Sequence, residues 1–163
     1  MTKSKRAWDK SQTLARHCQV PNQPKQTNMT QNCTIFYLDN DPDDLIIFGR
    51  VCRDLGYDPV LFDAPEKMIF SLERMIPCVL FVDLSLPHSS GYEITTELKA
   101  HRQFKDIPIV VYSDTVAKAD IDRITRLGAD YFIKKPMSPV KIKEAILEAL
   151  AALNIEKRCK TLE

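Results

Sequence analysis

The feature that most constrains the fold is a regular alternation of short apolar runs with longer segments of helical pattern. Five runs rich in β-branched and aromatic residues read as strands: 34–38, 58–62, 78–82, 107–111 and 130–133. A segment with helical periodicity or helix caps follows each run: about 42–55, 64–75, 89–101, 116–127 and 138–152. Because such alternation forms parallel sheets through right-handed crossovers, we predict an α/β fold. Its core would be a doubly wound, five-stranded parallel sheet with helices on both faces.

Composition limits the class of protein. The chain has 163 residues, of which 44% are hydrophobic, and this suffices for one domain with a core. No apolar run approaches the roughly 18 residues that a membrane helix needs, and no secretory signal is visible. The cysteines at 18, 33, 52, 78 and 159 show no paired or metal-like spacing. We therefore expect reduced thiols, buried at Cys52 and Cys78, and a cytoplasmic location.

The first part of the chain differs from the rest. Residues 1–33 hold six basic residues and one acidic residue, whereas the remainder is net acidic. Polar residues and two prolines without periodicity indicate a disordered arm. It is a solvated tail, an upstream extension of a chain that starts at Met29, or an electrostatic tether to an anionic partner. We expect a stand-alone domain over 34–153, a short polar tail at 154–163, and no nucleic acid or membrane partner.

Polar residues follow four of the predicted strands at the point where each strand ends. Asp39 and Asn40 follow the first strand, Asp83 the third, Ser113 the fourth and Lys135 the fifth. Parallel strands present their carboxyl ends at one edge, where ligands bind. Asp83 closes an apolar run and is costly to bury unpaired. Clustered carboxylates favour a divalent cation such as Mg²⁺, and a hydroxyl with an ammonium group favours phosphoryl oxygens, so the set suits phosphoryl transfer.

Four motifs in order carry a resemblance to a known family. They are Leu38-Asp39-Asn40-Asp41-Pro42, Phe81-Val82-Asp83-Leu84-Ser85-Leu86-Pro87 with Gly91, Val110-Val111-Tyr112-Ser113, and Lys135-Pro136. Together they resemble the signatures of response-regulator receiver domains of two-component signalling, over about 34–153. The resemblance implies a flavodoxin-like fold with strand order 2-1-3-4-5.

The resemblance also implies a function and a set of site residues. Asp83 would accept a phosphoryl group from a sensor histidine kinase or phosphotransfer protein in a phosphorelay. Ser113 and Lys135 would bind that group, and Phe132 would be the switch aromatic. The implied Mg²⁺ ligands are oxygen donors from Asp39, Asn40, Asp83 and the backbone carbonyl of Ser85. The chain would signal by contact with a downstream protein, as a monomer or homodimer, and would not be an enzyme beyond incidental autodephosphorylation.

Three positions depart from the family pattern or its commonest form. Asn40 stands where a second acid is usual, which predicts weaker Mg²⁺ binding unless Asp41 or water compensates. Asp114 stands beside the hydroxyl and would either repel an incoming phosphoryl group or point to solvent or cap a helix. Phe132 lacks the usual tyrosine hydroxyl and is either a switch or a core residue.

Two alternatives remain open. The domain could be a receiver-like adaptor that phosphorylation does not regulate. More remotely, Asp39-Asn40-Asp41 is similar to the motif of haloacid-dehalogenase-type phosphatases, with Asp39 as nucleophile and Asp41 as general acid. That alternative lacks the expected glycine and threonine and leaves Asp83 and Lys135 without a role.

Overall fold

The computed structural model describes residues 33–115 and 117–161. The expected arm at 1–33 lies, except for its last residue, outside this part. The elements in chain order are β1 (Thr34–Leu38), α1 (Pro42–Asp54), β2 (Asp58–Phe62), α2 (Pro65–Leu72), β3 (Val79–Val82), α3 (Gly91–Ala100), β4 (Ile109–Ser113), α4 (Lys118–Arg126), β5 (Tyr131–Lys134), α5 (Pro139–Ala152) and α6 (Ile155–Thr161). In the described residues, no helix is long and apolar enough to cross a membrane.

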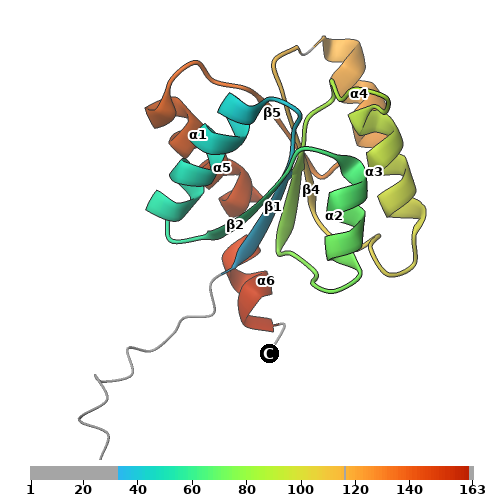
Figure 1. The fold of residues 1–163 in the computed structure, drawn as a ribbon, viewed down its shortest axis with the longest axis horizontal. Coiled ribbons are helices and arrows are strands. Elements are labelled where there is room, and N and C mark those ends of the chain that lie inside the picture. Colours follow the sequence, from blue (N-terminus) through green and yellow to red (C-terminus); the bar gives the residue numbers. More distant parts are fainter. Residues whose placement is uncertain (1–32, 116, 162–163) are drawn as a thin grey trace, which may run out of the picture.

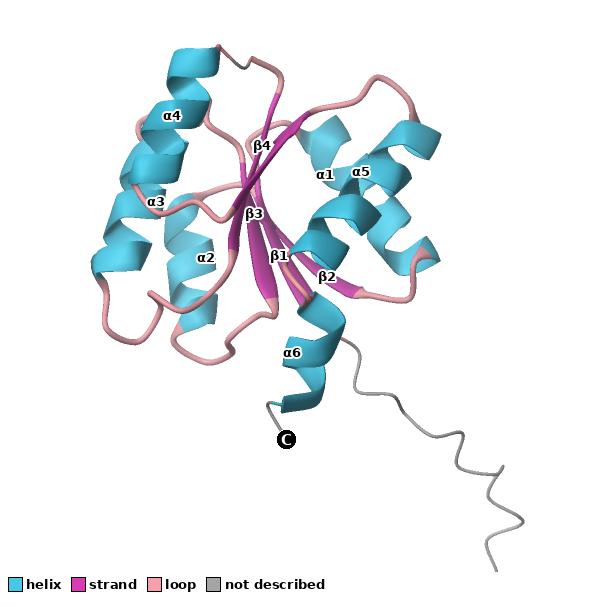
Figure 2. Ribbon diagram, turned by 180° about the vertical axis from the view of Figure 1, so that it is seen from behind, coloured by secondary structure: helices cyan, strands magenta, loops and turns pink. Residues whose placement is uncertain are grey.

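The five strands form one parallel sheet in the order β2-β1-β3-β4-β5. The predicted fold class and strand order are therefore confirmed. Helices α1 and α5 cover one face, and α2, α3 and α4 cover the other (Figures 1 and 2). Because both faces are covered, the central strands are buried throughout and read as continuous apolar runs.

Alternate side chains of the central strands enter separate cores on the two faces of the sheet. Tyr37 and Phe81 belong to the core beneath α1 and α5, whereas Phe36 and Leu80 belong to the core beneath α2 and α3. This division follows from the two-residue period of a strand. It also fixes which way Asp39 points, since Asp39 lies two residues beyond Tyr37.

The helix ends follow local signals in the sequence. The Asp41 carboxylate accepts hydrogen bonds from the backbone N–H groups of Asp43 and Asp44, and Pro42 is the first helical residue of α1. The start of α2 differs from this pattern. Its capping position is Ala64, which makes no side-chain hydrogen bond, and Asp63 pairs with Lys67 instead.

The C-terminal segment contains a helix that the sequence did not predict. Residues 154–163 were expected to form a polar tail, but α6 spans Ile155–Thr161 and begins with the fully buried side chain of Ile155. Figure 1 shows α6 close to the start of β1.

Cys33, directly before β1, and Cys159, in α6, form a disulfide, which contradicts the expectation that both are reduced. Cys52 is a buried free thiol as expected, and Cys78 is a partly buried one.

Candidate functional site

Two carboxylates lie side by side at the carboxyl edge of the sheet. Leu38 pairs with Val82, so the next residues, Asp39 and Asp83, sit at adjacent strand ends. The Asp83 backbone N–H donates to the Leu38 carbonyl at 3.0 Å, which holds this arrangement. Asp39 is 1% exposed and Asp83 is 4% exposed. Two acids are thus buried together at the predicted site.

The ammonium group of Lys135 lies among these acids. Strand β5 pairs with β4, and the Lys135 backbone N–H donates to the Ser113 carbonyl at 2.9 Å. Strand alternation exposes Lys134 and turns Lys135 inward, where its side chain is 7% exposed. Its Nζ atom is 2.7 Å from Asp39 Oδ2 and 3.7 Å from Asp83 Oδ1. One cation therefore bridges the first, third and fifth strands.

Two further carboxylates reach the same ammonium group. Asp44 Oδ2 of α1 accepts a hydrogen bond from Lys135 Nζ at 2.7 Å, and Asp114 Oδ2 lies 3.9 Å away. The Asp114 side chain is 74% exposed, so water weakens its interaction with the lysine. Four carboxylates thus surround one ammonium group, and the site carries excess negative charge.

The pKa values of the site reflect this imbalance. Burial raises the pKa of Asp83, Lys135 counteracts that rise, and the neighbouring Asp39 adds to it. Burial lowers the pKa of Lys135, but its hydrogen bonds to Asp39 and Asp44 outweigh burial, so the net shift is upward. Lys135 is therefore firmly charged, whereas ionised Asp83 is held at a cost in stability.

The loop after β3 fits closely around Asp83. The Ser85 backbone N–H donates to Asp83 Oδ2 at 3.0 Å. The Gly91 N–H donates to the Leu84 carbonyl at 3.1 Å, and a Cβ at Gly91 would lie 2.4 Å from the Asp83 carbonyl oxygen. Only glycine permits this approach. Gly91 therefore fixes the backbone that carries Asp83 and Ser85.

Ser113 and Phe132 occupy the neighbouring strands. Ser113 is 1% exposed, and its Oγ atom has no hydrogen-bond partner of normal geometry among the described residues, although it lies near enough to the Asp83 carboxylate to lower the pKa of that group. Such a buried hydroxyl is costly unless a ligand engages it. Phe132 is half-buried and packs against the cluster of Leu84, Val111 and Ile124. This cluster connects the residue that follows Asp83 with the strand that ends in Ser113.

Two of the positions that depart from the family pattern, Asn40 and Asp114, lie at the rim of the site. Asn40 is exposed. Asp41 is occupied as the cap of α1, which leaves it poorly placed to replace a missing acid. The α4 start is stabilised by Asp120, whose Oδ2 accepts from the Ala117 N–H, so Asp114 is not its cap.

Sequence reasoning missed two residues of the site, Tyr37 and Asp44. The Tyr37 hydroxyl donates to Asp39 Oδ2, and burial together with Asp39 raises the pKa of Tyr37. Its position two residues before Asp39, on the same face of β1, was a usable signal. Asp44 lies in the first turn of α1, where an acidic side chain is already favourable for the helix, and its contact with Lys135 depends on packing that no local pattern reveals.

The donors at this edge fit a hard divalent cation. Asp39 and Asp83 would supply carboxylate oxygens, the backbone carbonyl of Ser85 on the adjoining loop would be a further oxygen donor, and the ion would relieve the excess negative charge. A buried hydroxyl without a partner adds a donor for an anionic ligand. The fold and site together define a doubly wound α/β protein with an acidic, lysine-bridged site at the carboxyl edge of its sheet.

The comparisons place the chain within a family. The family model of the response regulator receiver domain matches residues 35–147, and the chain belongs to that family. Receiver domains are mainly signalling phosphoacceptors of two-component systems.

Three similar proteins illustrate the range of the family. An uncharacterized 76.5 kDa protein of Thiocystis violacea is 30% identical over 119 residues, which are 71% of this chain and 16% of that protein. The chemotaxis protein CheY1 of Helicobacter pylori is 29% identical over 113 residues, which are 64% of this chain and 89% of CheY1. The magnesium-bound receiver domain of the sensor histidine kinase PA1611 from Pseudomonas aeruginosa has a TM-score of 0.62 and 20% identity. That likeness covers 72% of this chain and 96% of the other, and it concerns the fold.

Proposed function

We propose that Asp83 is the phosphoacceptor of a response regulator that signals through protein contacts. The observation that carries the proposal is the convergence of a buried carboxylate, a buried ammonium group and a buried hydroxyl without a partner. Asp83 lies 3.7 Å from Lys135 Nζ, and β3 pairs with β4, which ends in Ser113. The donor would be a phosphohistidine of a sensor histidine kinase or phosphotransfer protein.

The chemistry of the transfer matches the residues present. An Asp83 carboxylate oxygen attacks the phosphorus, the phosphorus–nitrogen bond breaks, and the imidazole leaves with the electron pair and gains a proton. Lys135 and the Ser113 hydroxyl stabilise the negative oxygens of the transferred group. Asp39, Asn40, Asp83 and the Ser85 carbonyl would hold Mg²⁺, which neutralises charge on the phosphoryl oxygens when bound.

The phosphatase alternative has less support. Asp41 would have to serve as a general acid, but its carboxylate caps α1. Asp39 would have to be a nucleophile, but Tyr37 and Lys135 both donate to its Oδ2 atom. These contacts favour a structural and ligand-binding role for Asp39.

A small phosphodonor tests the phosphoacceptor role. We expect the chain, incubated with acetyl phosphate and Mg²⁺, to gain one phosphoryl group by intact mass, and Asp83→Asn to gain none. Asp114→Asn is the matched control, because it removes a neighbouring exposed carboxylate and should retain labelling. An unmodified chain that also fails to bind beryllofluoride would support the adaptor alternative instead.

Asn40 and Asp44 set the strength of metal binding. Asn40→Asp adds a carboxylate at the exposed rim and should tighten Mg²⁺ binding, measured by NMR shifts or by intrinsic fluorescence. Asp44→Asn should weaken it if the α1 carboxylate compensates for Asn40. Equal affinities for the native chain and Asn40→Asp would contradict the weakening assigned to Asn40.

Phe132 would transmit the change of state. The cluster of Leu84, Val111 and Ile124 contacts Phe132 and adjoins both Asp83 and Ser113. Phosphorylation would shift a two-state equilibrium by moving Ser113 and this cluster together. Phe132→Ala should retain phosphorylation while reducing the NMR shift changes that phosphorylation causes in α4, β5 and α5.

A cytoplasmic location accords with a receiver domain.

A further inference from the structure

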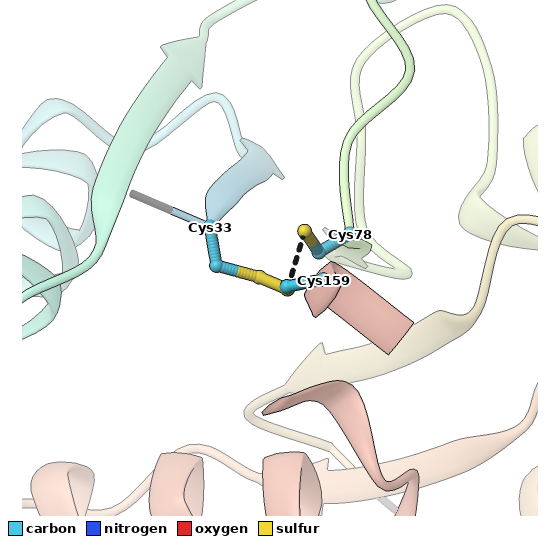
Figure 3. The surroundings of a disulfide bond; sticks show 3 residues. All are labelled: Cys33, Cys78 and Cys159. Carbon is cyan, nitrogen blue, oxygen red and sulfur yellow. Dashed lines mark hydrogen bonds between the residues drawn. A yellow bond between two sulfur atoms is a disulfide. The ribbon is translucent and has the colours of Figure 1, made fainter. Parts of the chain in front are cut away.

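Three cysteines meet at the edge of the sheet opposite the acidic site. Cys33 directly precedes β1, Cys78 directly precedes β3, and Cys159 lies in α6. Cys33 and Cys159 form a disulfide, and Cys78 Sγ lies 2.7 Å from Cys159 Sγ (Figure 3). The three sulfur atoms lie within 4.8 Å of one another and belong to partly buried residues. The length of a strand, roughly 15–20 Å, separates them from Asp39 and Asp83.

The fold brings the cysteines together for identifiable reasons. Strands β1 and β3 pair in register from Ile35 and Val79, and the Cys78 N–H donates to the Thr34 carbonyl at 2.9 Å. Cys78 therefore lies beside Thr34, and Cys33 is the next residue toward the start of the chain, so the two cysteines stand one residue apart along neighbouring strands. Burial of Ile155 anchors the start of α6, which carries Cys159 one helical turn further on to the same place.

The third sulfur gives this cluster a chemistry that a simple disulfide lacks. Cys159 Sγ carries no proton in its disulfide with Cys33, so the thiol proton in the contact belongs to Cys78. Exchange begins when a thiolate attacks a disulfide sulfur, and Cys78 already lies against one. The contact is with Cys159, which makes Cys33 the leaving thiol.

We propose that Cys33, Cys78 and Cys159 form a thiol–disulfide exchange site in which Cys159 is joined alternately to Cys33 and to Cys78. Cys78 gives its proton to water and attacks Cys159 Sγ. The bond to Cys33 breaks, and Cys33 Sγ leaves with the electron pair and takes up a proton. The number of disulfides is unchanged, so the exchange needs no oxidant. The initial disulfide forms from two thiols with a small disulfide such as oxidised glutathione, which is reduced to two thiols.

Exchange would move the covalent tether of α6 from one strand to the other. The tether joins α6 to β1 in one state and to β3 in the other, and these strands carry Asp39 and Asp83 at their far ends. Burial raises the pKa of the Cys78 thiol, so its thiolate is a minor form at neutral pH and exchange should accelerate in alkali.

A small disulfide also has a route to the site. A cavity of about 380 Å³ lies beside Cys78, between the segment before β3 and the segment before β4. Its lining residues include Ile76, Pro77, Asp106, Pro108 and Arg158, and Arg158 Nη1 donates to the Asp106 carbonyl at 3.4 Å. Arg158 and Asp106 supply opposite charges that could engage a carboxylate and an amino group of oxidised glutathione, so this cavity suits a small peptide disulfide.

Disulfide mapping of the full chain tests the proposal. The reduced chain, with and without Cys18→Ser, is incubated with oxidised glutathione, quenched in acid, alkylated, and digested for mass spectrometry. We expect two linked pairs, Cys33–Cys159 and Cys78–Cys159. Cys78→Ser should leave only the first pair and Cys33→Ser only the second. Cys52→Ala is the matched control, since it removes a buried thiol outside the cluster and should retain both pairs.

The outcomes that would overturn the proposal are distinct. The first is that Cys78 is found as a free thiol, or only as a glutathione adduct, both in the parent chain and in Cys33→Ser. Alternatively, the purified chain would contain three reduced cysteines and one equivalent of zinc, which would identify a thiolate metal site. Mapping of the parent chain decides the matter even if a variant fails to fold, and it does not depend on phosphorylation of Asp83.

Discussion

The two edges of the central sheet are built on opposite principles. At the carboxyl edge, four carboxylates surround one lysine, and a buried hydroxyl lacks a partner among the described residues. At the amino edge, a disulfide closes the cluster covalently and ties the last helix to the first strand. The carboxyl edge contains polar groups whose interactions a ligand can complete, whereas the disulfide at the amino edge contributes directly to the stability of the domain. Strands β1 and β3 run between the two edges, and each is flanked by a cysteine at one end and by an acidic site residue at the other.

Breaking the disulfide should produce the largest loss of stability. Its cysteines are 126 residues apart, and closure of so long a loop stabilises a domain by about 3–5 kcal/mol. We expect reductant to lower the denaturant midpoint of the native chain and to leave that of Cys159→Ser unchanged. Labelling by acetyl phosphate should persist in both. A midpoint insensitive to reductant would mean that the amino edge contributes little to the stability of the domain.

Removing the bridging lysine should have the next largest effect. Lys135→Met leaves Asp39 buried without its cation, and breaking a buried pair typically costs about 3 kcal/mol or more. Saturating Mg²⁺ should restore part of this loss, since the ion binds the folded state. The matched control is Lys67→Met, whose bridge to the exposed Asp63 is screened by water and should contribute little to stability. Equal losses in the two variants, measured by urea unfolding, would contradict the asymmetry between buried and exposed pairs.

The substitution Gly91→Ala should displace the backbone at the carboxyl edge of the sheet. The added Cβ would lie 2.4 Å from the Asp83 carbonyl oxygen, and relief of such overlap costs about 2 kcal/mol. Because the Asp83 backbone must shift, Mg²⁺ affinity should fall as well. Gly56→Ala is the control, since Gly56 has a φ of 84° and open space around it. It should lower stability by about 1 kcal/mol without changing Mg²⁺ affinity.

The carboxyl edge was largely predictable from the sequence, whereas the amino edge was not. Three of the site residues, Asp39, Asp83 and Lys135, directly follow a strand, and Ser113 is the last residue of β4. Parallel strands place these ends together. Which strand ends are neighbours depends on the strand order, which the resemblance to receiver domains implied and the structure confirms. Asp44 was missed because it approaches from α1 through tertiary packing.

The cysteine cluster gave no such local signal. It depends on α6, whose seven residues are too few to show a helical period and whose formation depends on burial of Ile155. Cys33 and Cys159 lie far apart in the sequence, and their spacing carries no pattern. Only the register of β1 with β3 and the packing of α6 bring the three sulfur atoms together.

Neutralising Asp83 should produce the smallest effect on stability and one of opposite sign. Burial and Asp39 raise the pKa of Asp83, so the folded chain binds a proton more tightly than the unfolded chain does. Ionised Asp83 therefore destabilises the fold at pH values above its raised pKa, and the penalty disappears below the ordinary carboxyl pKa of about 3.9. Asp83→Asn should accordingly raise the melting temperature at neutral pH and converge with the native chain in acid. Lys135 keeps its hydrogen bonds to Asp39 and Asp44 in this variant, so the gain is not offset by an unpaired lysine. A variant less stable than the native chain at neutral pH would show that Lys135 stabilises Asp83 more than burial and Asp39 destabilise it.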